Sequence, residues 1–109
     1  MNLTIEKIKD FSILTIDGRI DTSNFSVLEA KIDQLLSCGA TNIIFNCIGM
    51  NYISSSGLRV FLVAQKKTIQ MQGRLYLCNM QPAIKEIFFI SGFNSIFRIF
   101  DTLEEALKQ

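Results

Sequence analysis

Short apolar runs alternate along this chain with longer segments in which apolar residues recur every three or four positions. The short runs predict β-strands and the longer segments predict amphipathic helices, because one face repeats every second residue in a strand and about every 3.6 residues in a helix. Strands that alternate with helices imply crossover connections between parallel strands. The pattern therefore predicts an α/β domain with a mixed, mostly parallel β-sheet and about four helices packed on it.

The expected strands, in chain order, span residues 3–8, 11–17, 42–46, 74–78 and 96–100. The first two are separated by Lys9 and Asp10 and predict an N-terminal hairpin. The run at 42–46 shows no alternation, which predicts a central strand that is covered on both faces. Gly18 is expected to end the second strand, and residues 47–55 are expected to form a loop.

The expected helices cover residues 25–38, 57–72, 82–91 and 103–108. Ser26 and Glu29 have the spacing of a capping box, and Pro82 suits a first helical position. Asp101 and Thr102 are expected to cap the last helix. Glycines are expected to stop the first three helices, at Gly39, Gly73 and Gly92.

Length, charge and residue types narrow the class of protein. A chain of 109 residues fits a single domain, residues 1–109. The net charge is only +1, so no nucleic-acid partner is expected. No apolar run approaches the roughly 20 residues that cross a bilayer, so we expect no membrane contact and a cytoplasmic location. Histidine is absent and neither GxxxxGK[ST] nor GxGxxG occurs, so no enzyme activity, metal or cofactor is expected.

The three cysteines, Cys38, Cys47 and Cys78, are expected to be small, buried, apolar side chains. Their number is odd and no CxxC occurs, so neither a disulfide framework nor a metal site is expected. Five phenylalanines crowd the last quarter of the chain: Phe88, Phe89, Phe93, Phe97 and Phe100. Most of them are expected in the core, and a surplus one on the surface would mark a second interface.

Three consecutive serines, Ser54, Ser55 and Ser56, stand directly before Gly57, where the expected loop passes into the second helix. A serine at a helix start caps a free backbone N–H group, so one interpretation is an ordinary serine-rich cap. A phosphate at that place is also stabilised, by backbone N–H groups and the helix dipole. The other interpretation is therefore a surface hydroxyl that carries phosphate without unfolding the helix.

The segment from Asn46 to Leu58 resembles the signature of the STAS domain. This is the family of bacterial anti-sigma factor antagonists and of the cytoplasmic tails of sulfate transporters. Residues 18–21, Gly-Arg-Ile-Asp, are similar to a second motif of the family that precedes the first helix. The likeness covers essentially the whole chain and implies a single STAS-like domain that acts as an anti-sigma factor antagonist.

The resemblance also implies a switch. In the family, the serine directly before the motif glycine is phosphorylated by the partner anti-sigma factor, which is a serine kinase. That serine is Ser56 here, with Ser55 as the alternative. Unphosphorylated antagonist binds the anti-sigma factor and frees a sigma factor, phosphorylated antagonist is released, and a phosphoserine phosphatase resets the cycle. The implied partner-binding residues are Asp21, Thr22, Ser54, Ser55, Gly57, Leu58 and Arg59.

Two positions depart from the family pattern. Asn46 stands where the family usually has Asp at the end of a strand, and Ser54 stands where Asp is often found. These departures leave open a second function, a STAS scaffold subunit of a signalling or transport complex that is not phosphorylated. Two further roles stay open: Asp21 either caps the first helix or contacts the partner, and Arg59 either lies on a solvated face or contacts the partner.

Overall fold

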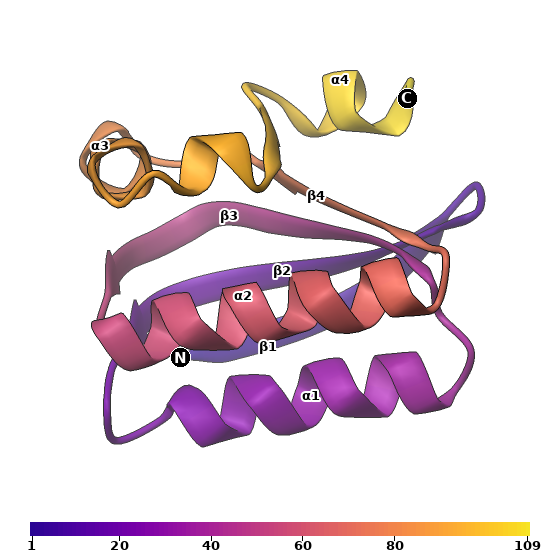
Figure 1. Cartoon of the computed structure of the whole chain (residues 1–109), viewed down its shortest axis with the longest axis horizontal. Helices are drawn as coiled ribbons and strands as arrows, with labels where there is room; N and C mark the ends of the chain where they lie inside the picture. Colours follow the sequence, from indigo (N-terminus) through magenta and orange to yellow (C-terminus); the bar gives the residue numbers. More distant parts are fainter.

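The computed structural model describes all 109 residues, which form five strands, four α-helices and a short 3-10 helix (Figure 1). The strands are β1 (Asn2–Ile8), β2 (Phe11–Ile20), β3 (Asn42–Ile53), β4 (Arg74–Cys78) and β5 (Arg98–Phe100). The helices are α1 (Phe25–Ser37), α2 (Ser55–Gln70), α3 (Pro82–Ile90), the 3-10 helix η1 (Phe93–Ser95) and α4 (Leu103–Leu107). None of the helices combines the length and the apolar character that crossing a bilayer requires.

The strands form one sheet in the order β1-β2-β3-β4-β5. β1 and β2 pair antiparallel as a hairpin, and every other neighbouring pair is parallel. Each parallel pair is joined by a helical crossover, through α1, α2 and α3 in turn. The predicted α/β fold, with a mixed and mostly parallel sheet, an N-terminal hairpin and four helices, is confirmed.

The helices cover the two faces of the sheet unequally. α1 and α2 lie side by side along one face (Figure 1), and α3 adds Ile84 and Phe88 to the same core. α4 packs on the opposite face, where Ala106 joins a smaller core with Phe11 and Tyr76. The sheet is therefore buried on both faces at its centre, as the unbroken apolar run of β3 predicts.

The five C-terminal phenylalanines divide as expected. Phe88 and Phe97 are buried in the larger core, where Phe93 packs against them, and Phe100 packs against the smaller core. The prediction that most of the five belong to the core is confirmed. Phe89 is the surplus one, with 52% of its surface exposed.

The second and third strands are longer than predicted. Pairing of β2 with β3 continues as far as Ile20 and Ile53, so the predicted strand end at Gly18 and the predicted loop at 47–55 are wrong. Gly18 has a φ of 103° and lies at an irregularity of the pairing, where its lack of a side chain permits the bulge. The polar and glycine residues of this stretch resemble a loop locally, but long-range pairing between parallel strands decides its structure.

The predicted glycine stops are confirmed after α1 and α3 but not after α2. Gly39 and Gly92 follow α1 and α3 with φ values of 89° and 77°. After α2, however, Gln72 takes the left-handed conformation, with a φ of 60°. Gly73 is needed for space instead, because a Cβ there would lie 2.0 Å from the carbonyl oxygen of Thr41.

The helix and strand starts bring further corrections. The predicted capping box of Ser26 and Glu29 does not form, because the N-cap of α1 is Asn24, two residues before Ser26. α2 begins at Ser55, two residues before the predicted start, and β5 begins at Arg98 because Ile96 and Phe97 form the turn that follows η1. Thr102 caps α4 as predicted, since its Oγ1 accepts the N–H of Glu105 at 3.2 Å.

The cysteines are free thiols in two environments. Cys47 and Cys78 are buried on opposite faces of the sheet, one in each core. Burial raises the pKa of the Cys47 thiol far above its usual value and that of Cys78 to about 12, so both stay protonated. Cys38 is exposed just after α1, so the prediction that all three are buried is wrong for this residue.

Candidate functional site

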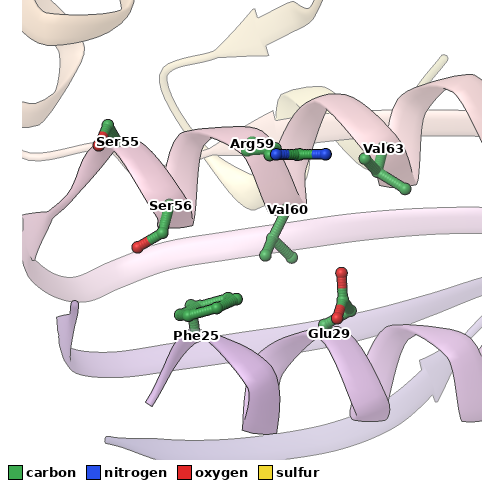
Figure 2. A pocket seen from close by; sticks show the side chains of 7 residues that line it. All are labelled: Phe25, Glu29, Ser55, Ser56, Arg59, Val60 and Val63. Carbon is green, nitrogen blue, oxygen red and sulfur yellow. The ribbon is translucent and has the colours of Figure 1, made fainter. Parts of the chain in front are cut away.

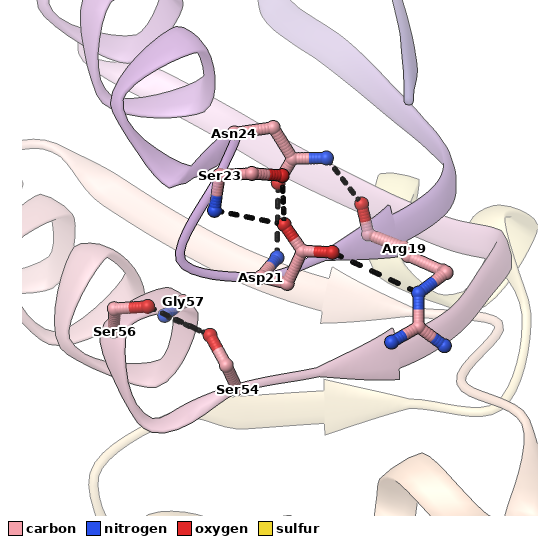
Figure 3. Close-up of polar contacts among 7 residues, drawn as sticks. All are labelled: Arg19, Asp21, Ser23, Asn24, Ser54, Ser56 and Gly57. Atoms are coloured by element: carbon pink, nitrogen blue, oxygen red, sulfur yellow. Dashed lines mark hydrogen bonds and ion pairs between the residues drawn. The ribbon is translucent and has the colours of Figure 1, made fainter.

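The candidate site lies where the carboxyl ends of β2 and β3 lead into α1 and α2 (Figure 3). The N–H of Ser54 donates a hydrogen bond of 2.9 Å to the carbonyl oxygen of Ile20, at the end of β2. This bond fixes the start of α2 beside the loop that leads to α1. The fold thus brings the two predicted motifs together at one edge of the sheet.

Ser54 is the serine that caps α2. Its Oγ accepts the N–H of Gly57 at 3.2 Å and lies 2.7 Å from the Oγ of Ser56. Ser55 and Ser56 are the first two residues of the helix, and neither hydroxyl is needed for the cap. Ser55 is exposed and Ser56 is half-buried, so capping explains one of the three serines and leaves two available.

Replacing Ser54 with alanine is expected to lower the free energy of unfolding by about 1 kcal/mol, because the Gly57 N–H loses its acceptor. Ser54→Asp keeps an acceptor and places a negative charge at the helix start, so it is expected to retain the stability. Urea unfolding followed by circular dichroism measures both variants. Equal stability of wild type and Ser54→Ala would contradict the capping role.

Gly57 and Leu58 hold α2 in place. Gly57 is buried, and a Cβ there would lie 2.8 Å from side-chain atoms of both Ile20 and Ile53. Gly57 therefore allows close packing of the helix on the strand ends and does not open the backbone to another molecule. Leu58 is half-buried and packs against the larger core.

The Asp21 carboxylate closes a small turn before α1. Its Oδ1 accepts the N–H of Ser23 at 3.0 Å and the Ser23 hydroxyl at 2.6 Å, and its Oδ2 lies 3.7 Å from the Nε of Arg19. The Ser23 hydrogen bonds, with a smaller effect of Arg19, hold the pKa of Asp21 below its usual value. The backbone carbonyl of Asp21, not its carboxylate, accepts the N–H of Phe25 at 3.0 Å. The carboxylate thus shapes the turn and stays charged, and it caps no N–H group of α1.

One cationic and one aromatic residue at this edge, Arg19 and Tyr52, are not among the predicted site residues. The guanidinium of Arg19 lies 4.3 Å from the ring centroid of Tyr52, and Tyr52 is 40% exposed. Asn24 joins the same cluster by donating to the Arg19 carbonyl at 2.9 Å and accepting the N–H of Asp21 at 2.9 Å. Thr22 lies exposed on the same loop. Arg19 and Tyr52 lie within the two motifs, but they meet only through the unpredicted strand extensions, so the sequence gives no sign of their contact.

A hollow of about 560 Å³ opens between α1 and α2 beside the serines (Figure 2). Its lining consists of Phe25, Glu29, Ser55, Ser56, Arg59, Val60 and Val63. In Figure 2 the Ser56 hydroxyl points toward the α1 side of the hollow, whereas Ser55 lies on the far side of α2. Phe25 and Glu29 also escape prediction as site residues, because only the packing of α1 beside α2 places them there.

No cluster of three or more Asp, Glu or Cys side chains of the kind that binds a metal ion occurs in the structure. Asn46 lies away from the serines, because β3 continues for seven residues beyond it to Ile53. Its Oδ1 accepts the side-chain amide of Asn79 at 3.0 Å and the N–H of Ile48 at 3.3 Å. Of the two positions that depart from the family pattern, only Ser54 therefore lies beside Ser56.

Known proteins resemble this chain over nearly its full length. BtrV of Bordetella bronchiseptica, named as an anti-sigma factor antagonist, is 38% identical over 97% of this chain and 91% of its own. An anti-sigma-B factor antagonist of Staphylococcus epidermidis is 27% identical over 91% of this chain and 94% of its own.

Solved structures share the fold. An anti-sigma factor antagonist from Thermotoga maritima superposes with a TM-score of 0.93 at 20% identity, over 97% of this chain and 92% of that one. The phosphorylated form of the Bacillus cell fate determinant SpoIIAA gives a TM-score of 0.77 at 26% identity, over 98% of this chain and 97% of that one. The family model of the STAS domain matches residues 2–106. The chain therefore belongs to the STAS domain family.

Proposed function

We propose that this chain is an anti-sigma factor antagonist that is switched by phosphorylation of Ser56. The observation that carries the proposal is the division of roles among the three serines. Ser54 caps α2, and the Ser56 hydroxyl, which is hydrogen-bonded only to the Ser54 hydroxyl at 2.7 Å, stands at the rim of an open hollow where it can accept a phosphoryl group. The names of the most similar relatives support the antagonist role, and phosphorylated SpoIIAA supports the choice of modification.

The partner in this proposal is an anti-sigma factor that acts as a serine kinase on a nucleoside triphosphate. The Oγ of Ser56 bonds to the γ-phosphorus, the bond from that phosphorus to the bridging oxygen breaks, and the nucleoside diphosphate leaves. The hydroxyl proton passes to a base on the kinase. The antagonist supplies the acceptor and no catalytic group, and a phosphoserine phosphatase later hydrolyses the ester with water. The cycle operates in the cytoplasm.

The contact surface comprises the exposed residues around the acceptor. Thr22, Ser55 and Arg59 are exposed, and Asp21 and Tyr52 present part of their surface beside them. A phosphate on Ser56 adds about −1.5 to −2 charge at neutral pH. Burying that charge in the interface without a partner costs several kcal/mol, so the complex dissociates without any change of fold.

The test is the intact mass of the protein isolated from its native cells, with the modified residue mapped by fragmentation. We expect an added phosphate on Ser56 that is absent from a Ser56→Ala variant expressed in the same cells. Ser55→Ala is the matched control and is expected to keep the phosphate. Phosphate on Ser55 alone would move the acceptor by one residue, and no phosphate under any growth condition would contradict the switch.

One observation favours a second function. Ser54 supplies no charge beside Ser56, where the family often has Asp. A STAS scaffold subunit of a signalling or transport complex needs the fold and the contact surface but no phosphoryl acceptor. In that case Ser56→Ala leaves both partner binding and its regulation unchanged, whereas the antagonist loses its regulation.

A further inference from the structure

Arg59 differs from the other arginines of the chain. Arg19, Arg74 and Arg98 each make a polar contact with a neighbouring side chain and also lie over an aromatic ring. Arg59 makes no hydrogen bond and no ion pair, although it lines the hollow beside the serines. A free guanidinium at this place is available to a negative group that is not yet present.

The helix places Arg59 within reach of Ser56. Residues three apart in a helix are surface neighbours, with Cβ atoms about 5–6 Å apart. Side chains in a helix lean toward its N-terminus, so a residue covers the turn that precedes it. Both residues line the same hollow, and the Arg59 guanidinium, which points along α2 toward Val63 in Figure 2, reaches the turn that contains Ser56 by rotation about its side-chain bonds.

We propose that Arg59 is the residue that holds the phosphate of this switch, through an ion pair with phosphorylated Ser56. The inference rests on the proposed function for the identity of the modified residue. A guanidinium and a phosphate form charge-assisted hydrogen bonds that are often bidentate. The ion pair fixes the phosphate at the rim of the hollow and withdraws the Arg59 guanidinium from the contact surface. Phosphorylation thus adds a negative charge to that surface and removes a positive one.

A phosphate on Ser56 needs a neighbouring cation, because the other charged groups near the hollow are carboxylates. Glu29 faces Arg59 from α1 and makes no ion pair, so its carboxylate repels a phosphate on Ser56. Asp21, on the loop before α1, is engaged by Ser23 and Arg19. Arg59 is thus the one cation that lines the hollow.

The experiment uses the full chain with phosphoserine installed at position 56 by genetic code expansion, so that it needs neither the kinase nor the native cell. Phosphorus-31 NMR then follows the second ionisation of the phosphate, whose usual pKa is about 6. A neighbouring cation favours the dianion, so we expect the pKa to be lower in the wild-type background than in Arg59→Gln by about half a unit. Arg59→Lys is expected to restore part of the difference, and high salt is expected to reduce it.

Lys66→Gln is the matched control, because Lys66 is an exposed cation on the same helix seven residues beyond Arg59. It is expected to leave the pKa unchanged. Equal pKa values in the wild-type and Arg59→Gln backgrounds would overturn the proposal, as would an equal shift in the Lys66→Gln background. Absence of phosphate in native cells would contradict the proposed function but would leave this measurement as it stands.

Discussion

Replacing Phe61 with alanine is expected to lower the free energy of unfolding by about 3–5 kcal/mol. Phe61 is fully buried on α2, with ring centroids 5.0 Å from Phe45, 5.7 Å from Phe88 and 6.4 Å from Phe97. One side chain thus joins the central strand, α3 and the segment before β5. Its truncation removes the transfer free energy of the ring and leaves a cavity that rigid neighbours cannot fill.

Urea unfolding followed by circular dichroism measures this loss. Phe89→Ala is the matched control, since Phe89 lies on α3 but is largely exposed, and it is expected to change the stability by about 0.5 kcal/mol or less. A loss for Phe61→Ala no greater than that for Phe89→Ala would show that α2 is not anchored through this ring. Because α2 also carries Ser56, the same packing keeps the acceptor in place.

The order of elements follows from periodicity because local side-chain patterns decide helix and strand. The apolar spacing of α1, the Pro82 start of α3 and the Thr102 cap of α4 are local signals, and the structure confirms them. The C-terminal half of β3 could not be predicted in this way. It exists because β2 pairs with it in parallel at a distance of some 30 residues, with bulges that its own composition does not reveal.

In the candidate site, too, the features with a local signal could be predicted and those that depend on tertiary structure could not. Three serines before a glycine predict a helix start and a phosphoryl acceptor, but the sequence does not say which serine is the cap. The answer depends on where α2 begins, at Ser55 and not at Gly57. The stacking of Arg19 on Tyr52 and the hollow that places Glu29 opposite Arg59 are tertiary features, with no local signal in the sequence.

Phosphoserine at position 56 is expected to weaken binding of the cognate anti-sigma factor by a factor of about 100 or more. Leaving a buried charge without a partner costs about 3–5 kcal/mol, and each 1.4 kcal/mol is a tenfold change in affinity. The pairing with Arg59 moderates this cost and removes a cation from the interface. Isothermal titration calorimetry with the purified anti-sigma factor kinases of the native organism, tested one by one, identifies the cognate partner and measures the difference.

Phosphoserine at position 37 is the matched control for this effect. Ser37 is exposed at the far end of α1, a helix of 13 residues and therefore about 20 Å long, so a phosphate there adds the same charge away from the candidate interface. It is expected to leave the affinity nearly unchanged. If both phosphoserine proteins bind equally well, the interface does not include Ser56. If both bind equally weakly, overall charge rather than the local site governs release. Only a loss of affinity confined to position 56 agrees with a phosphorylation switch at Ser56, one of the two serines that do not cap the helix.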